Sequence, residues 1–176
     1  MKNKWKFPIC QIVGYKNSGK TTLMQNITHS LSSQGFQVGT LKHHGHGGEP
    51  ELIEETDSYK HLQAGAAISA VKGENRFQVM VKHASDELAE LIQFYTLLPL
   101  DILFIEGFKQ AEHPKIVLIR DAEDLLLLHE LTNIIAVGAR DFSLIRNLNY
   151  FTFVMDESNN YLPGLIQYMK GKCSGI

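Results

Sequence analysis

Short apolar runs alternate with longer amphipathic segments along the chain, and the two patterns predict different elements. The sequence DILFIEG at 101–107 is almost unbroken in apolar residues, which is typical of a central strand in a parallel sheet. Further short apolar runs predict strands at 9–13, 36–43, 115–120, 133–138 and 150–155.

Helical spacing is clearest between residues 19 and 34, where Leu23, Ile27 and Leu31 fall on one stripe. Similar but shorter patterns predict helices at 57–65, 86–95 and 159–171. Strands that alternate with helices in this way predict an α/β fold of three layers with a mostly parallel sheet. A chain of 176 residues is long enough for one core around such a sheet, so we predict a single domain over residues 1–176.

One pair of strand-like runs does not fit the alternation. Residues 66–73 and 76–83 flank the turn-forming sequence GEN, which predicts a β-hairpin at an edge of the fold. Both runs are apolar at several positions, so the hairpin would leave an edge that must be covered. Two interpretations stay open here: the hairpin forms a homodimer, or the predicted helix at 86–95 covers it.

Composition is that of a soluble globular chain, with 44% hydrophobic and 20% charged residues. A formal net charge of −2 gives no reason to expect nucleic acid, and no run approaches the roughly 20 apolar residues of a membrane span. The N-terminal apolar run is short and leads into a glycine loop, which predicts a strand rather than a signal peptide. Cys10 lies in that strand and Cys173 in a tail that we expect to fray, so we predict free thiols in the cytoplasm.

Residues 14–21, GYKNSGKT, satisfy the pattern G-x-x-x-x-G-K-[ST] in full, between a predicted strand and a predicted helix. The glycines allow the backbone N–H groups to point inward and bind anionic oxygens at a helix N-terminus. Lys20 adds a full positive charge, with a catalytic role towards the phosphates, and the Thr21 hydroxyl is a ligand for Mg²⁺. The motif predicts a P-loop NTPase fold whose nucleotide-binding residues are Gly14, Tyr15, Lys16, Asn17, Ser18, Gly19, Lys20, Thr21 and Thr22.

A P-loop site also needs an acidic residue near the metal, and two acids bracket the central strand. Ligands bind at the carboxyl ends of parallel strands, and Asp101 would lie about 17 Å from that end. Glu106 is therefore the predicted catalytic and Mg²⁺-binding carboxylate, and Gly107 beside it would let the backbone approach the nucleotide.

The loop after the second strand, KHHGHGGEPE, is predicted to emerge at the same edge. We predict that Lys42 and His43 respond to the terminal phosphate, as switch loops do, and that Asp57 joins the Mg²⁺ shell. The alternatives are a transition-metal site built on His43, His44 and His46, or an ordinary polar loop.

The identity of the base is weakly specified. Guanine-specific proteins of this fold often carry N-K-x-D after a late strand, whereas this chain has GARD, in which only Asp141 matches. A carboxylate at Asp141 is a chemically sensible acceptor for guanine N–H donors. The pattern alone leaves GTP and ATP both open.

Four segments occur in a characteristic order: GYKNSGKTTL, TLKHHGH, DSYKHLQAGA and EGFKQAEHPKIVLIR. Together they resemble the molybdopterin-guanine dinucleotide biosynthesis protein B (MobB) family over essentially the whole chain. The resemblance implies a small P-loop GTPase or GTP-binding adaptor of the molybdenum-cofactor pathway, which dimerises and supports the guanylyltransferase that joins GMP to molybdopterin. The family motifs fall on Lys42, His43, Asp57, Ser58, Glu106, Gly107, Phe108, Lys109, Pro114, Lys115 and Arg120.

Lys109, Lys115 and Arg120 form a cationic set within this resemblance. They would meet the pterin phosphate or an acidic partner surface, unless they are ordinary solvated charges.

We therefore expect a GTP-binding adaptor with slow, Mg²⁺-dependent hydrolysis at most, because the sequence offers only four arginines and no obvious base. The alternatives are a small-molecule kinase, which would need an arginine-rich closure, and a metallochaperone GTPase that uses the histidine loop.

Overall fold

The structure is a computed structural model of the chain, and it describes residues 5–44, 54, 56–82, 87–155 and 160–173. The chain divides into two compact units. The first comprises Met1–Gly45 and Leu88–Ile176, and the second comprises His46–Glu87. The single domain predicted over residues 1–176 stays a prediction.

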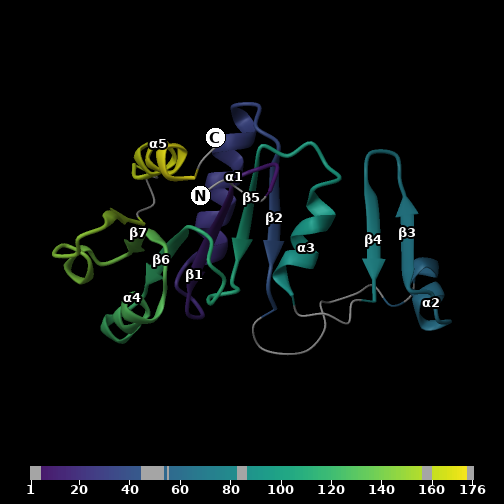
Figure 1. Cartoon of the computed structure of the whole chain (residues 1–176), viewed down its shortest axis with the longest axis horizontal. Helices are drawn as coiled ribbons and strands as arrows, with labels where there is room; N and C mark the ends of the chain where they lie inside the picture. Colours follow the sequence, from purple (N-terminus) through teal and green to yellow (C-terminus); the bar gives the residue numbers. More distant parts are fainter. Residues whose placement is uncertain (1–4, 45–53, 55, 83–86, 156–159, 174–176) are drawn as a thin grey trace. The chain divides into compact units, whose positions relative to one another are not determined.

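The first unit contains a six-stranded sheet in the order β2-β5-β1-β6-β7-β8, in which every neighbouring pair is parallel (Figure 1). All six strands run in the same direction, so their carboxyl ends meet at one edge. The strands are β1 (Ile9–Gly14), β2 (Val38–Lys42), β5 (Ile102–Glu106), β6 (Lys115–Ile119), β7 (Ile134–Ala139) and β8 (Phe151–Val154). The predicted strands and the parallel α/β fold are thereby confirmed.

Helices cover both faces of this sheet, which gives the predicted three layers (Figure 1). On one face, α1 (Lys20–Ser33) and α5 (Leu162–Lys172) pack on a continuous apolar core, in which Leu23, Ile27 and Leu31 form the predicted stripe. On the other face, α3 (Leu88–Tyr95) covers β5 and α4 (Leu127–Glu130) covers β6 and β7. The sequence did not predict α4 or the two short 3₁₀ helices Ala122–Leu126 and Phe142–Leu144.

The second unit contains α2 (Asp57–Gln63) and the predicted hairpin, formed by β3 (Ile68–Lys72) and β4 (Phe77–Val81). The side chain of Thr56 caps α2 by accepting a hydrogen bond from the backbone N–H of Tyr59. The two strands pair antiparallel in a sheet of their own, separate from the six-stranded sheet.

Cys173 contradicts the expectation of a frayed C-terminal tail. It follows the last residue of α5 and is buried in the same core cluster as Cys10. The hydrogen bond with Cys173 and burial raise the pKa of the Cys10 thiol well above its usual range. Both thiols are free, as predicted. Within the described part of the chain, none of the helices has the length and apolar character to cross a bilayer.

Candidate functional site

The glycine loop joins the end of β1 to the start of α1, as its sequence predicts. A Cβ atom at Gly14 would lie 2.5 Å from Ser18 Oγ and 2.8 Å from the Leu118 carbonyl oxygen, so only glycine allows this close turn. Asn17 adopts a left-handed conformation with φ 64°, which helps to curl the loop. Ser18 is buried, and its Oγ finds no hydrogen-bond partner among the described residues.

Lys20 opens α1 and turns back over the loop. Its Nζ donates a hydrogen bond to the Tyr15 carbonyl oxygen at 2.7 Å. Burial lowers the pKa of Lys20, the Glu106 carboxylate opposes this shift, and the ammonium groups of Lys109 and Lys42 lower the pKa further. Three lysines therefore lie close enough to influence one another electrostatically at the P-loop.

Glu106 ends β5 and meets these groups at the carboxyl edge of the sheet. The Thr21 hydroxyl donates to one oxygen of this largely buried carboxylate at 3.4 Å, and Lys42 Nζ lies 3.5 Å from the other. Asp101 precedes β5 at the opposite edge, where its carboxylate accepts a hydrogen bond from the Gln37 backbone at 2.7 Å. Glu106 thus lies at the carboxyl end of β5 and Asp101 before its start, as predicted, and the role of Glu106 towards Mg²⁺ stays a prediction.

The residues after Glu106 pack against the start of the histidine loop. The His43 backbone N–H donates to the Glu106 carbonyl oxygen at 2.9 Å, and the His43 and Phe108 rings lie 4.5 Å apart. Gly107, at φ 96°, leaves room for this contact, because a Cβ there would lie 2.9 Å from His43 Cβ. One residue further, Lys109 Nζ lies 3.8 Å from the centre of the Tyr15 ring.

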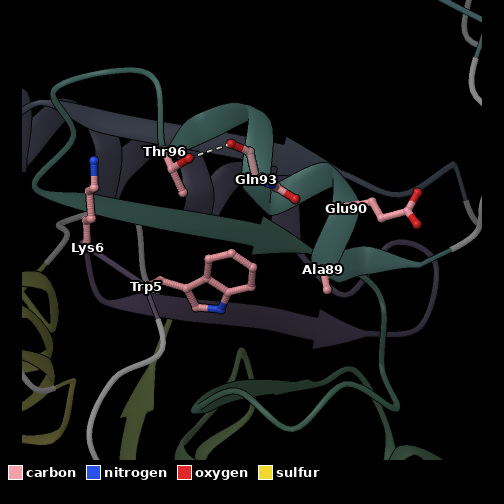
Figure 2. Close-up of a pocket in the computed structure, with 6 residues that line it drawn as sticks. All are labelled: Trp5, Lys6, Ala89, Glu90, Gln93 and Thr96. Carbon is pink, nitrogen blue, oxygen red and sulfur yellow. Dashed lines mark hydrogen bonds between the residues drawn. The ribbon is translucent and has the colours of Figure 1, made fainter.

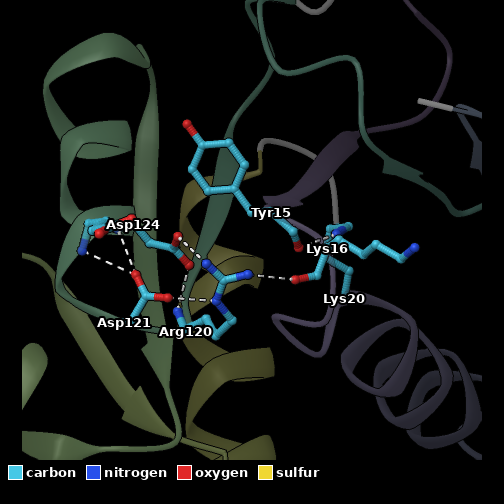
Figure 3. A network of polar contacts seen from close by, with 7 residues as sticks. Tyr15, Lys16, Lys20, Arg120, Asp121 and Asp124 are labelled. Atoms are coloured by element: carbon cyan, nitrogen blue, oxygen red, sulfur yellow. Dashed lines mark hydrogen bonds and ion pairs between the residues drawn. The ribbon is translucent and has the colours of Figure 1, made fainter. Parts of the chain in front are cut away.

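Arg120, which follows β6, makes polar contacts with the P-loop and with two acidic residues (Figure 3). Its Nη1 donates to the Lys16 carbonyl oxygen at 3.3 Å, and its Nε donates to Asp121 at 2.7 Å. The hydrogen bond from Arg120 lowers the pKa of Asp121. The buried Asp124 carboxylate accepts from the Arg120 backbone N–H at 2.8 Å and lies 3.5 Å from Nη2. Arg120 therefore contacts the loop backbone rather than forming an isolated solvated charge.

The grouping of Lys115 with the exposed cations is wrong. Lys115 has no exposed surface, and its ammonium donates to the carbonyl oxygens of Ala111 and His113. Burial lowers its pKa, and the Glu112 carboxylate opposes part of that shift. A buried ammonium that binds backbone carbonyls cannot also reach a pterin phosphate or a partner surface.

The sequence GARD, at the position of the guanine motif N-K-x-D, differs from that motif because of side-chain packing. A Cβ at Gly138 would lie 2.5 Å from the Phe153 ring, so the strand packing excludes asparagine at this position. Asp141 follows β7, and its carboxylate accepts a hydrogen bond from the Ser143 backbone at 2.8 Å. A hydrogen bond with the Ser143 side chain and this backbone bond together lower the pKa of Asp141. Its predicted role in base recognition stays a prediction.

The predicted roles of two groups in metal binding stay predictions. Asp57 belongs to the second unit, where it pairs with Lys60 at 3.1 Å, and His46 lies outside the described residues. Within the described ranges, no group of three or more histidine, cysteine or acidic side chains is arranged to hold a metal ion. The adjacent hydroxyl of Thr21 and carboxylate of Glu106, by contrast, are the oxygen ligands that suit Mg²⁺.

A separate pocket of about 390 Å³ lies beside α3 (Figure 2). The Trp5 ring forms one side of it, and Gln93 and Thr96 line the helix side. None of the predicted nucleotide-binding residues lines this pocket, so it is distinct from the P-loop site.

Two buried polar residues near the site, Gln11 and Asp124, are not among those predicted from the sequence. Gln11 Nε2 donates to the carbonyl oxygens of Gly107 and Phe108, at 3.0 and 2.9 Å. A polar residue in the middle of an apolar strand was the only signal for Gln11. Asp124 carried no signal, because its burial depends on a short helix that the sequence did not predict.

A parallel sheet whose first strand passes through G-x-x-x-x-G-K-T into a helix defines an α/β protein of the P-loop NTPase fold. The family described as "Molybdopterin guanine dinucleotide synthesis protein B" matches residues 9–140. The chain belongs to this family, MobB.

Relatives extend the match along the chain. A probable molybdopterin-guanine dinucleotide biosynthesis adapter protein of Bacillus subtilis is 48% identical over 134 residues, 74% of this chain and 75% of the relative. The adapter protein of Escherichia coli is 33% identical over 125 residues, 69% of this chain and 70% of the relative. The crystal structure of a MobB homolog from Bacillus stearothermophilus superposes with a TM-score of 0.74 at 34% identity, covering 93% of this chain and 98% of the other.

Proposed function

We propose that this chain is a GTP-binding adapter protein of molybdopterin-guanine dinucleotide biosynthesis, with slow Mg²⁺-dependent hydrolysis at most. The pathway and the adapter role are those named for its relatives from Bacillus subtilis and Escherichia coli. The observation that carries the nucleotide part is the meeting of Lys20, Thr21 and Glu106 at the end of the glycine loop.

The charges at this edge favour a polyphosphate. Lys20, Lys42 and Lys109 lie within electrostatic reach of one another, together with the two carboxylates of Glu106 and Asp124, so the positive charge exceeds the negative charge. Burial lowers the pKa of Lys20 and repulsion from the other two lysines lowers it further, and this repulsion would be relieved when an anionic ligand enters. The N-terminus of α1 and the N–H groups of the loop add donors for phosphate oxygens.

Thr21 and Glu106 are the residues that would hold Mg²⁺. The ion would neutralise charge on the phosphates and orient them. Lys42, whose Nζ lies 3.5 Å from Glu106, would contact a phosphate bound beside this carboxylate. The adjoining His43 would thus respond to the nucleotide through its bond to the Glu106 carbonyl.

Slow turnover is expected because Arg120, which contacts the loop at the Lys16 carbonyl, is already engaged by Asp121 and Asp124. An arginine that stabilises the transition state must be free to approach the terminal phosphate. An adapter that reports bound GTP to a partner enzyme needs no fast hydrolysis. The expected partner is the guanylyltransferase of the pathway, in the cytoplasm.

Self-association is the second part of the proposal. One face of the hairpin is apolar and open, with Ile68 59%, Phe77 66% and Val79 46% exposed. An isolated two-stranded sheet is marginally stable in water, so a second copy would stabilise this face. Phe77→Lys should then give a monomer by light scattering, whereas Gln78→Lys, on the opposite face of β4, should not. If both variants keep the mass of the unmodified protein, the hairpin is not the dimer interface.

Calorimetric titration of the full chain with GTP, GDP and ATP, with and without Mg²⁺, tests the nucleotide assignment. We expect GTP to bind more tightly than ATP and to require Mg²⁺ for full affinity. Lys20→Ala should abolish triphosphate binding with an unchanged circular dichroism spectrum, and Lys6→Ala, an exposed lysine before β1, should bind normally.

Four results would contradict the proposal. Tighter binding of ATP than of GTP would overturn the base assignment. Turnover on the order of tens per second without a partner would favour an enzyme over an adapter. Transfer of phosphate to an added metabolite would indicate a kinase, and stoichiometric transition metal that is lost on changing His43 and His44 to Ala would indicate a metallochaperone.

A further inference from the structure

The face of the sheet that carries α3 and α4 has an interrupted core. Along β1, Ile9 packs in the cluster under α3 and Val13 in the cluster under α4. Gln11 lies between them and has no exposed surface. Its partner in the neighbouring strand is Lys115, which is equally buried. Burying two polar side chains at the centre of a sheet costs free energy unless both side chains form hydrogen bonds.

The connection from β5 to β6 supplies the acceptors for these hydrogen bonds. Residues 107–114, which we call the crossover loop, pass over β1 without forming a helix, whereas parallel strands are usually joined through one. Irregular backbone packed against a sheet leaves carbonyl groups that need donors. Gln11 Nε2 binds the Gly107 and Phe108 carbonyls, and the Lys115 ammonium binds those of Ala111 and His113.

Two further donors complete the attachment of the loop. Asn133 Nδ2 donates to the Glu112 carbonyl oxygen at 2.8 Å, and the backbone N–H of Gln11 donates to that of Pro114, also at 2.8 Å. Six of the eight carbonyls therefore bind groups from outside the loop: those of Gly107, Phe108, Ala111, Glu112, His113 and Pro114. The side chains of Gln11 and Lys115 account for four of them.

The first part of the crossover loop carries groups of the nucleotide site. Phe108 packs on His43, and Lys109 lies over Tyr15 of the P-loop. Gly107 and Phe108 both have positive φ, 96° and 49°, and Phe108 pays a steric cost in this conformation. Such backbone persists only where its surroundings hold it, and the two hydrogen bonds from Gln11 fall on these two residues.

We propose that Gln11 and Lys115 are positioning residues: by binding the carbonyls of the crossover loop they fix its path over β1 and hold Lys109 at the P-loop. Their effect is that the site binds a triphosphate in preference to a diphosphate. The inference rests on the proposed nucleotide-binding function. A triphosphate carries more negative charge than a diphosphate, so it gains more from a third lysine held beside Lys20 and Lys42. A loosened loop leaves Lys20 in place and removes mainly the contribution of Lys109.

The test compares the affinities of a non-hydrolysable GTP analogue and of GDP for the full chain in the presence of Mg²⁺. Gln11→Met keeps the shape of the side chain and removes its donor. It should weaken the triphosphate analogue about tenfold, as expected for one charge-assisted contact, and GDP by less than about threefold. Lys109→Gln should reproduce this selective loss. The control is Thr28→Val, which removes a buried hydroxyl in α1, and it should leave both affinities unchanged.

A double variant separates positioning from a general structural role. If Gln11 acts through Lys109, Gln11→Met combined with Lys109→Gln should be about as selective as either single change, since the second change removes nothing further. Hydrogen exchange should also quicken within residues 107–113 of Gln11→Met. Multiplied effects of the two changes on the ratio of affinities would overturn the inference.

The remaining outcomes are also decisive. If Gln11→Met lowers the melting temperature but keeps the triphosphate-to-diphosphate ratio, Gln11 is structural and the proposed function stands. A wild-type chain that binds neither nucleotide overturns the proposed function, and this inference with it. Lys115→Met should show the same selective loss, and if this variant does not fold, the Gln11 and Lys109 variants decide the result.

Discussion

The two faces of the central sheet are built differently. Under α1 and α5 the core is a single apolar cluster that includes Cys10, Ile12 and Phe104. The opposite face has two smaller clusters, one under α3 and one under α4, separated by Gln11 and Lys115. The same six strands thus support a continuous core on one side and a polar break on the other.

The two faces therefore have different roles: one mainly stabilises the fold, and the other fixes the position of the crossover loop. The continuous face holds α1 against the sheet, and α1 carries Lys20 and Thr21 at its start. The interrupted face holds a loop in an irregular path that hydrophobic packing alone would not specify, because apolar contacts are not directional. We therefore expect substitutions on the two faces to differ in both the size and the kind of their effects.

The largest effect should come from the continuous face. Ile27→Ala removes a fully buried side chain of α1 and should lower the free energy of unfolding by about 2–5 kcal/mol in urea titrations. The ratio of triphosphate to diphosphate affinity should remain that of the wild type. A changed ratio at unchanged stability would contradict the separation of the two faces.

A smaller loss is expected from the interrupted face. Lys115→Met fills the same space but leaves the Ala111 and His113 carbonyls without their donor, which should cost about 1–3 kcal/mol of unfolding free energy. Lys109→Met makes the same chemical change on the surface side of the crossover loop and should stay within about 0.5 kcal/mol. Equal losses in the two variants would show that the burial of Lys115 has no energetic consequence.

Local sequence patterns predicted most of the strands and helices that build the two faces. The glycine loop, the stripe of α1 and the strand that ends at Glu106 are each specified by residues close in sequence. The choice of Glu106 over Asp101 needed only the rule that parallel strands share their carboxyl edge. Thr21 and Glu106, 85 positions apart, lie together as that rule requires.

The interrupted face could not be predicted in the same way. The sequence does not distinguish Lys115 from an exposed cation, because its burial depends on the register of β6 with β1. Nor does it show that Cys173 is buried, because that burial depends on the packing of α5. Gly138 differs from the expected asparagine because of the Phe153 ring, which belongs to another strand. In each case the deciding contact joins residues distant in sequence.

The Arg120 cluster offers a milder test at the carboxyl edge of the interrupted face. Asp124→Asn keeps the shape of the side chain but weakens its bonds to the Arg120 backbone and guanidinium, which should cost about 1–2 kcal/mol of unfolding free energy. Glu123→Gln, a neighbouring acid, is the matched control and should have no measurable effect. If Arg120 supports the P-loop through Lys16, Asp124→Asn should weaken GTP and GDP to the same extent, unlike the Gln11 variant.

The smallest effect should appear in alkaline solution, at the edge where the two faces meet. In the free protein the pKa of Lys20 is lowered by burial and by the charges of Lys109 and Lys42, and bound phosphate would raise it. Binding then takes up a proton once the pH exceeds the pKa of the free protein, so the affinity falls as the pH rises, by at most about tenfold per unit.

Lys42→Gln removes one repulsive charge, which raises the pKa of free Lys20 and moves the alkaline fall in affinity to higher pH. Ionisation of the nucleotide is the same for both proteins, so the difference between their alkaline titrations isolates Lys20. Glu106→Gln removes an attractive charge and should move the fall in the opposite direction. Shifts of the same sign in the two variants would mean that Lys20 is not the group that titrates.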